Sequence, residues 1–223
     1  MKPFNNIRTI ARFETKTLLR SWFFRIFAFI GVAILTIFNL AMLLDEGARW
    51  TMRAVSSSLP YTNLIIFNIA QSVIAAFLAS DFLKRDKKLD TTEVIYIRSM
   101  SNGEYVLGKT LGIIIVFLIL NILVVLISGT INLLMEGVTV SYMSYLLYPL
   151  LISMPTLIYI LGLAFITMII LRNQAVSFVV LLGYIAVCLF YISGRYSYLF
   201  DYMAFSLPMI HSDLSGFADL PAI

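Results

Sequence analysis

Two short stretches of this 223-residue sequence contain residue types that bind ATP in nucleotide-hydrolysing proteins. Residues 103–110, GEYVLGKT, match the letters of a phosphate-binding loop, and residues 41–46, AMLLDE, match the end of a Walker B strand. A phosphate-binding loop, however, follows a strand and precedes a water-facing helix. Thr110 instead begins an apolar run without charges. We therefore expect the chain to bind no ATP, and no other cofactor, directly.

Residues that build metal sites and catalytic centres are scarce. His211 is the only histidine and Cys188 the only cysteine, so a zinc site would need several carboxylates from elsewhere in the chain. The sequence offers no recognisable set of nucleophile, base and orienting acid. We expect no metal site, no catalytic residue and no enzyme activity, and we expect His211 to be a solvated surface residue.

The composition is that of a membrane protein. Hydrophobic residues make up 61% of the chain and charged residues 13%, against about 45–50% and about 25% in soluble domains. Five uncharged apolar runs are each near the roughly 20 residues that cross a bilayer as a helix. These runs place the spans at residues 26–44, 61–80, 111–135, 145–171 and 175–193. The sequence thus predicts an all-α, polytopic transmembrane helical bundle, with residues 1–223 forming a single transmembrane domain.

The cationic residues are spread unevenly over the segments that join the spans. Thirteen of the sixteen Lys and Arg residues lie in residues 1–25, in residues 81–109 or at Arg172. The positive-inside rule then predicts a multi-pass protein of the cytoplasmic (inner) membrane with its N-terminus in the cytoplasm. Residues 194–223 would form an external tail, whose short apolar pieces suit helices lying at the outer surface. Because the cations lie beside the apolar runs, we expect them to set orientation and expect no nucleic-acid partner.

Cationic residues recur every four positions near the N-terminus. This spacing places them along one side of a helix, and apolar residues gather on the other side. The cations are Arg8, Arg12, Lys16 and Arg20, and the apolar set is Ile7, Ile10, Ala11, Leu18 and Trp22. We interpret residues 1–25 as an interfacial helix whose cations contact anionic membrane lipids. The alternative is that the charges only determine topology.

Residues 90–109, DTTEVIYIRSMSNGEYVLGK, contain two helix starts. Asp90 with Glu93, and Ser101 with Glu104, each have the spacing of a helix cap with its reciprocal acid. A short helix should therefore precede the long helix that enters the third span. Eleven charges in residues 81–109 require this segment to be in water.

This stretch resembles the loop between spans two and three of the permease subunits of type-2 ABC transporters, an exporter group with an in-plane N-terminal helix and six spans. The resemblance implies that residues 81–109 are a cytoplasmic coupling loop whose short helix rests on an ABC ATPase subunit. It implies that six residues serve coupling to the ATPase: Asp90, Thr91, Thr92, Glu93, Arg98 and Glu104. Ser101, Asn102, Gly108 and Lys109 would lie where the chain re-enters the membrane. A sixth span is missing, so the chain would be the N-terminal portion of a longer, bacterial protein.

By this resemblance the chain is the permease subunit of an ATP-driven exporter, coupling motion of the ATPase to substrate translocation. ATP would bind the partner subunit, and two permease halves would pair as a homo- or heterodimer. The alternative is a non-transporting membrane anchor or assembly module of a larger protein. A proton-driven transporter is disfavoured because no Asp, Glu, Lys, Arg or His falls within a predicted span.

Amide side chains are the most polar groups within the predicted spans. Four of them are candidates for a translocation path: Asn39, Asn68, Gln71 and Asn121. The alternative, and the more common role of such groups, is hydrogen bonding between helices. Gly108 and Gly112 form a small-xxx-small pair that permits close helix approach. Pro149 and Pro155 should bend the fourth span.

Overall fold

The computed structural model describes residues 3–47, 55, 57–88, 101–135, 140–192, 195–196, 200–203 and 211. Every regular element within these residues is a helix, which confirms the predicted all-α class. In chain order the elements are α1 (Pro3–Arg20), α2 (Trp22–Leu44), α4 (Ser58–Lys88), α6 (Asn102–Leu134), α7 (Tyr142–Tyr148), η1 (Pro149–Ser153), α8 (Met154–Leu171), α9 (Gln174–Val187) and η2 (Cys188–Ile192).

Five helical stretches among the described residues are long and apolar enough to cross a membrane. They are Trp22–Leu44, Ser58–Ala79, Asn102–Leu134, Tyr142–Leu171 and Gln174–Ile192. Each overlaps one of the five predicted spans. Large apolar side chains also cover the outside of the bundle, such as Phe29 on α2 and Ile169 on α8. These features are those of a membrane-embedded protein.

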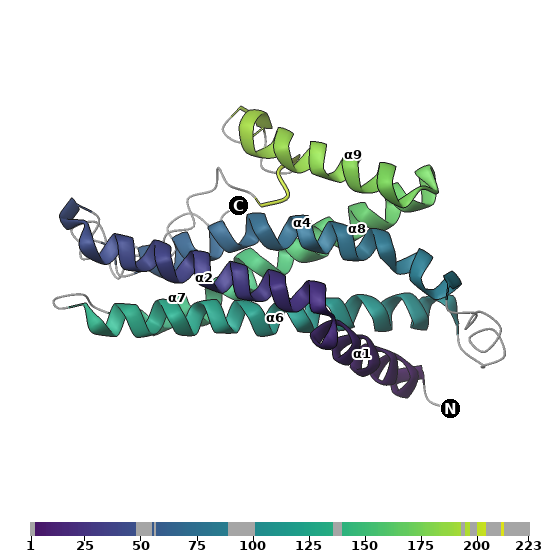
Figure 1. Ribbon diagram of the computed structural model, residues 1–223, viewed down its shortest axis with the longest axis horizontal. Coiled ribbons are helices and arrows are strands. Elements are labelled where there is room, and N and C mark those ends of the chain that lie inside the picture. Colours follow the sequence, from purple (N-terminus) through teal and green to yellow (C-terminus); the bar gives the residue numbers. More distant parts are fainter. Residues whose placement is uncertain are drawn as a thin grey trace.

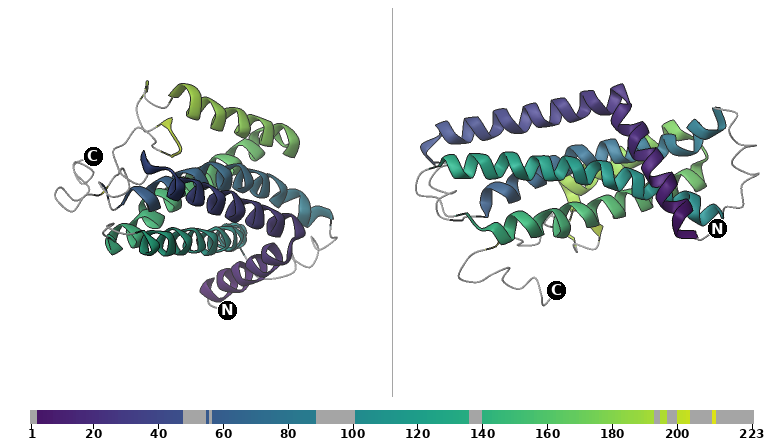
Figure 2. Two further views of the ribbon diagram at one scale, coloured as in Figure 1. Left: turned by 60° about the vertical axis from the view of Figure 1, so that its left-hand side comes forward. Right: turned by 90° about the horizontal axis from the view of Figure 1, so that it is seen from below.

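The long helices α2, α4, α6 and α8 run along the long axis of the molecule (Figure 1). Helix α4 is central, because it contacts α2, α6, α7, α8 and α9. Helix α9 covers α4 and α8 on one side, and α1 lies across α6 near one end of the bundle. The right-hand view of Figure 2 shows α1 running steeply across the long helices rather than along them.

The centre of the bundle combines aromatic rings with small residues. Phe24 on α2 meets Phe117 on α6 edge to face, with ring centroids 5.9 Å apart. Phe27 lies 6.3 Å from the same ring. On α4, Ala75 and Ala76 are fully buried, and such small residues let neighbouring helices approach closely.

Helices α4 and α6 are longer than the apolar runs within them. Helix α6 begins at Asn102, nine residues before the apolar run that starts at residue 111, and its 33 residues span about 50 Å, against a hydrocarbon core of about 30 Å. The predicted capping box of Ser101 and Glu104 is present and starts α6 at this point. Helix α4 continues to Lys88. The predicted loop 81–109 is therefore helical at both ends, and residues 89–100 lie outside the described part.

The N-terminal helix also differs from its predicted bounds. The N-terminal helix ends at Arg20, Ser21 has an extended backbone, and α2 starts at Trp22, so the expected interfacial helix 1–25 is shorter by one turn.

In the fourth span the prolines leave the helix unbroken, but residues Pro149–Ser153 are π-helical. A π-helical turn accommodates residues that cannot complete the α-helical hydrogen-bond ladder.

Candidate functional site

Helix α1 packs on the first part of α6 through the two glycines that the sequence singled out. A Cβ atom added at Gly108 would lie 2.7 Å from Cβ of Ile10, and one added at Gly112 would lie 2.6 Å from Cβ of Glu14. No larger residue fits at either position without moving α1. The small-xxx-small pair thus brings together α1 and α6, two elements separated by about 100 residues of sequence.

A buried pair of opposite charges lies at this junction. Nζ of Lys109 on α6 is 3.9 Å from Oε2 of Glu14 on α1, and the two side chains are only 6% and 3% exposed. The Lys109 ammonium also lies 5.0 Å from the centroid of the Tyr105 ring, within the range of a cation–π interaction. Glu14 is the only acid in the first 25 residues. Its position on the otherwise apolar side of α1 is the signal that the sequence analysis missed.

Hydrogen bonds join α1 to α6 on both sides of this pair. Asn6 Nδ2 donates to Glu104 Oε2 at 3.2 Å, and the same carboxylate oxygen accepts from the backbone N–H of Ser101. Two turns further along, the Thr15 hydroxyl donates to the carbonyl oxygen of Gly112 at 3.3 Å. The first turn of α6 and the body of α1 are therefore one connected unit, which we call the α1–α6 junction.

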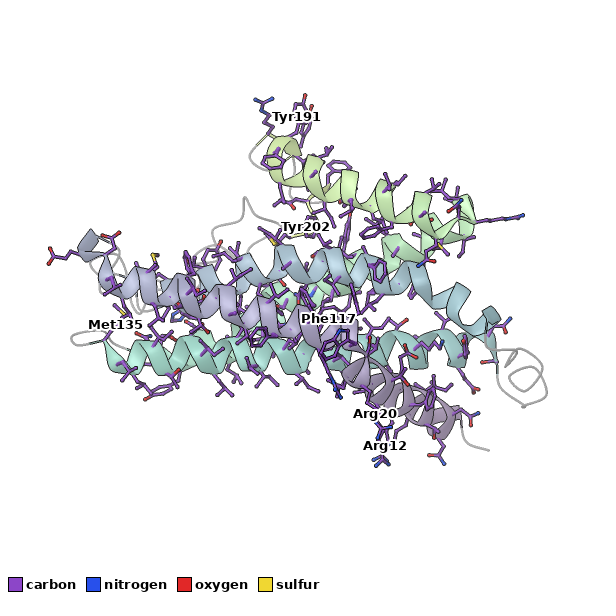
Figure 3. All side chains as sticks on the ribbon, in the orientation of Figure 1. Arg12, Arg20, Phe117, Met135, Tyr191 and Tyr202 are labelled. Carbon is purple, nitrogen blue, oxygen red and sulfur yellow. The ribbon has the colours of Figure 1, made fainter. Side chains whose placement is uncertain are left out.

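The cationic side of α1 faces away from the bundle. Arg8, Arg12, Lys16 and Arg20 are all exposed, and Figure 3 shows Arg12 and Arg20 extending outward from α1. The opposite side of α1 does not remain free for lipid, because Ala11 and Leu18 are buried. Trp22, expected on that side, belongs to α2 and is exposed.

The structure places one of the six predicted coupling residues. Glu104 belongs to the α1–α6 junction through its contacts with Asn6 and Ser101. The other five, Asp90, Thr91, Thr92, Glu93 and Arg98, lie outside the described residues. The described helices on either side of these five residues are α4 and α6. Helix α4 ends, and helix α6 begins, at the end of the bundle that carries α1 (Figure 1).

The four predicted path residues form two separate buried hydrogen-bond groups. Gln71 donates to Asn68 Oδ1 on its own helix, and Asn121 on α6 donates to Gln71 Oε1 at 2.9 Å. Asn39 on α2 exchanges two hydrogen bonds with Asn63 on α4, at 2.8 and 2.9 Å. All these side chains are essentially inaccessible. Asn63 was missed because a lone amide near a span end carries no periodic signal.

At the end of the bundle opposite α1, hydroxyl and amide groups join the helices. Asn132 donates to the Tyr145 hydroxyl at 2.9 Å, and the backbone N–H of His211 donates to the Tyr148 hydroxyl at 2.8 Å. The Ser57 hydroxyl donates to the carbonyl oxygen of His211. His211 is partly exposed, and these contacts hold its backbone against α7 and against Ser57, which precedes α4.

Three residues of the predicted external tail pack against the bundle, and a fourth, Phe200, contacts it through its backbone. Asp201, Tyr202 and Met203 are buried, and the carbonyl oxygen of Phe200 accepts a hydrogen bond from the Tyr184 hydroxyl of α9. These three residues are covered by the helices, and the position of the tail relative to the membrane stays a prediction. Asp201 therefore places a carboxylate in a buried position, where its Oδ1 accepts a hydrogen bond from the backbone N–H of Met203.

Among the described residues, no three His, Cys, Asp or Glu side chains are grouped so as to hold a metal ion. Comparison with known proteins found no matching family model, no matching curated protein and no matching solved structure. The functional assignment therefore rests on the geometry of this chain.

Proposed function

We propose that this chain is the membrane-spanning permease subunit of an ATP-driven, ABC-type exporter. The observation that carries the proposal is the α1–α6 junction. A membrane anchor needs only apolar spans, whereas this junction fixes a surface helix onto the first turns of a central span. That arrangement suits a protein that receives mechanical work at one end of its bundle.

The transmission path follows from the connections of α6. Residues 89–100 lead directly into the capped first turn of α6, and that turn is bonded to α1 through Asn6 and Glu104. A displacement of residues 89–100 would move α6 and α1 together, because the glycine contacts and the Glu14–Lys109 pair leave little room for sliding. A contact that differs between two states of a partner can shift the spans between two arrangements.

In this proposal the end of the bundle that carries α1 faces the cytoplasm of a cell whose inner membrane holds the protein. The exposed cations of α1 then lie at the inner surface and contact anionic lipids. Asp90, Thr91, Thr92, Glu93 and Arg98 contact the ATPase subunit, which binds and hydrolyses ATP. The chain itself holds no nucleotide and catalyses no reaction.

A second permease half completes the translocation path. Within one copy, the amides of α2, α4 and α6 are bonded to one another and inaccessible. A substrate could reach Asn39, Asn68, Gln71 or Asn121 only if α4 moved relative to its neighbours. A homo- or heterodimer, opened by the ATPase cycle, would provide that movement.

Copurification tests this proposal. The tagged chain, expressed in its native host and solubilised in mild detergent, should bring down a protein with the nucleotide-binding motifs of an ABC ATPase. Glu93→Lys should abolish that association. Glu46→Lys makes the same charge change beyond the far end of α2 and should leave the association intact. Recovery of no ABC ATPase, or equal recovery with both variants, would favour the membrane anchor.

A further inference from the structure

Residues 20–25, which we call the α1–α2 elbow, lie where the chain enters the membrane. The charge-free apolar run of α2 starts directly after Arg25, at Ile26, and the membrane-length stretch starts at Trp22. Ser21 has an extended backbone between the two helices, so the chain bends here (Figure 2). Because charged groups are costly in the hydrocarbon core, Arg25 marks the depth at which lipid headgroups lie.

The end of α1 holds the Arg25 side chain in place. Nε of Arg25 donates to the carbonyl oxygen of Leu19 at 3.0 Å, one of the last carbonyl groups of α1, which lack a partner within their own helix. This bond uses one of the five N–H donors of the guanidinium. The donors on the two Nη atoms have no partner among the described residues, and the side chain is exposed. The guanidinium is therefore oriented and able to bind an anion.

A second cation and an indole ring lie at the same elbow. Arg20 is the last residue of α1, and its exposed side chain extends outward (Figure 3). Trp22 is 75% exposed. Glu14 is the only acid among residues 1–44, and it is buried beside Lys109. The elbow thus presents two arginines that no acid of α1 or α2 neutralises.

These groups match the chemistry of an anionic phospholipid. A guanidinium binds phosphate oxygens through two parallel hydrogen bonds, and an indole favours the boundary between headgroups and acyl chains. The side of α2 that follows the elbow is apolar, with Phe29 and Ile30 exposed, so acyl chains can lie along it. Two arginines without an acid favour a headgroup of net negative charge over a zwitterionic one.

We infer that the α1–α2 elbow binds the headgroup phosphate of one anionic phospholipid, with Arg25 and Arg20 contacting the phosphate and Trp22 lying beside the acyl chains. General attraction of lipid by the cations of α1 requires no oriented group, whereas this site depends on Arg25 of α2. The inference goes beyond the proposed function and does not depend on contact with an ATPase. The purified chain, reconstituted in lipid nanodiscs, is sufficient to test it.

Trp22 provides the probe, because Trp50→Phe leaves it as the only tryptophan. The nanodiscs contain phosphatidylcholine and a small fraction of lipid brominated near the headgroup, and quenching of Trp22 fluorescence measures which lipid lies beside it. Brominated phosphatidylglycerol should quench about fivefold more effectively than brominated phosphatidylcholine. Arg20→Gln and Arg25→Gln should each remove most of this preference, since one cation near the membrane surface contributes about fivefold. Arg12→Gln removes an exposed cation two turns before Arg20 and should leave the preference unchanged.

Three results would overturn the inference. They are equal quenching by the two brominated lipids, an unchanged preference in either Arg20→Gln or Arg25→Gln, and an equal loss in Arg12→Gln, which would show general attraction by α1. The Arg20 side chain makes no contact with another described side chain, so Arg20→Gln tests the site even if Arg25→Gln loosens α1. Inorganic phosphate, added against chloride of equal ionic strength, should leave the quenching unchanged. Displacement of the lipid by phosphate would assign the elbow to a soluble ligand instead.

Discussion

Nζ of Lys109 on α6 lies 3.9 Å from Oε2 of Glu14 on α1, and both side chains are buried. Such a pair constrains α1, because moving either helix would separate two buried opposite charges. Removing one partner from a buried pair is far more damaging than replacing both.

Glu14→Ala should therefore destabilise the protein by about 3 kcal/mol, because it leaves the Lys109 ammonium buried without its carboxylate. The double variant Glu14→Leu with Lys109→Met should recover most of this loss. Thermal unfolding in detergent measures both effects, with Arg12→Ala on the exposed side of α1 as the control. A double variant no more stable than the single one would show that the charges act independently.

Enlarging the glycines of α6 should displace α1. Gly112→Ala places a methyl group 2.6 Å from Cβ of Glu14, an overpacking expected to cost about 1–3 kcal/mol. Gly108→Ala should behave similarly. The readout is the rate of tryptic cleavage at Arg12 together with the unfolding temperature.

Gly183→Ala is the matched control for these substitutions. It lies in α9, and an added Cβ would meet nothing within 4 Å. This change should be neutral or slightly stabilising, since alanine is the better helix former by about 1 kcal/mol. Equal effects at Gly112 and Gly183 would mean that the α1–α6 contact does not hold α1 in place.

The buried amides should contribute to stability. Gln71→Leu removes the link between Asn68 and Asn121 and is expected to cost about 1–2 kcal/mol in unfolding free energy. Thr130→Val is the control, because that exposed hydroxyl bonds only within its own helix. If Gln71→Leu instead kept full stability and impaired transport, the amides would serve the substrate path rather than helix association.

The cationic stripe of α1 should select anionic lipids. Changing Arg8, Arg12, Lys16 and Arg20 together to Gln should weaken association with phosphatidylglycerol by about 1 kcal/mol for each cation lost. Native mass spectrometry of lipid retained after purification measures this. Arg172→Gln, an exposed cation in the turn between α8 and α9, should have a much smaller effect. Unchanged lipid retention in the fourfold variant would leave topology as the sole role of these charges.

The sequence predicted those features that are encoded within one or two helical turns. Span positions follow from uncharged runs of membrane length, and the Ser101–Glu104 capping box follows from its three-residue spacing. The glycine pair of α6 was recognisable as a close-approach surface, but nothing local identified α1 as its partner.

The remaining features depend on contacts between distant segments. In the sequence, Glu14 is one acid among basic neighbours. Its partner Lys109 lies 95 positions later, so only the folded structure shows the pair. The predicted helix start at Ser101 is confirmed, but no local pattern showed that α1 packs on the turns that follow it. Residues 201–203 looked like part of a polar tail because Asp201 is charged, and their burial depends on packing against helices that are distant in the sequence.

The most direct test of the central claim is a photo-crosslinking measurement in living cells. A photoreactive phenylalanine analogue at Glu93 should form a covalent adduct with an ABC ATPase, identified by peptides that carry its nucleotide-binding motifs. The same analogue at Glu46, at the end of the bundle opposite α1, should form no such adduct. Absence of the ATPase adduct at Glu93, or the same adduct from both positions, would contradict the account.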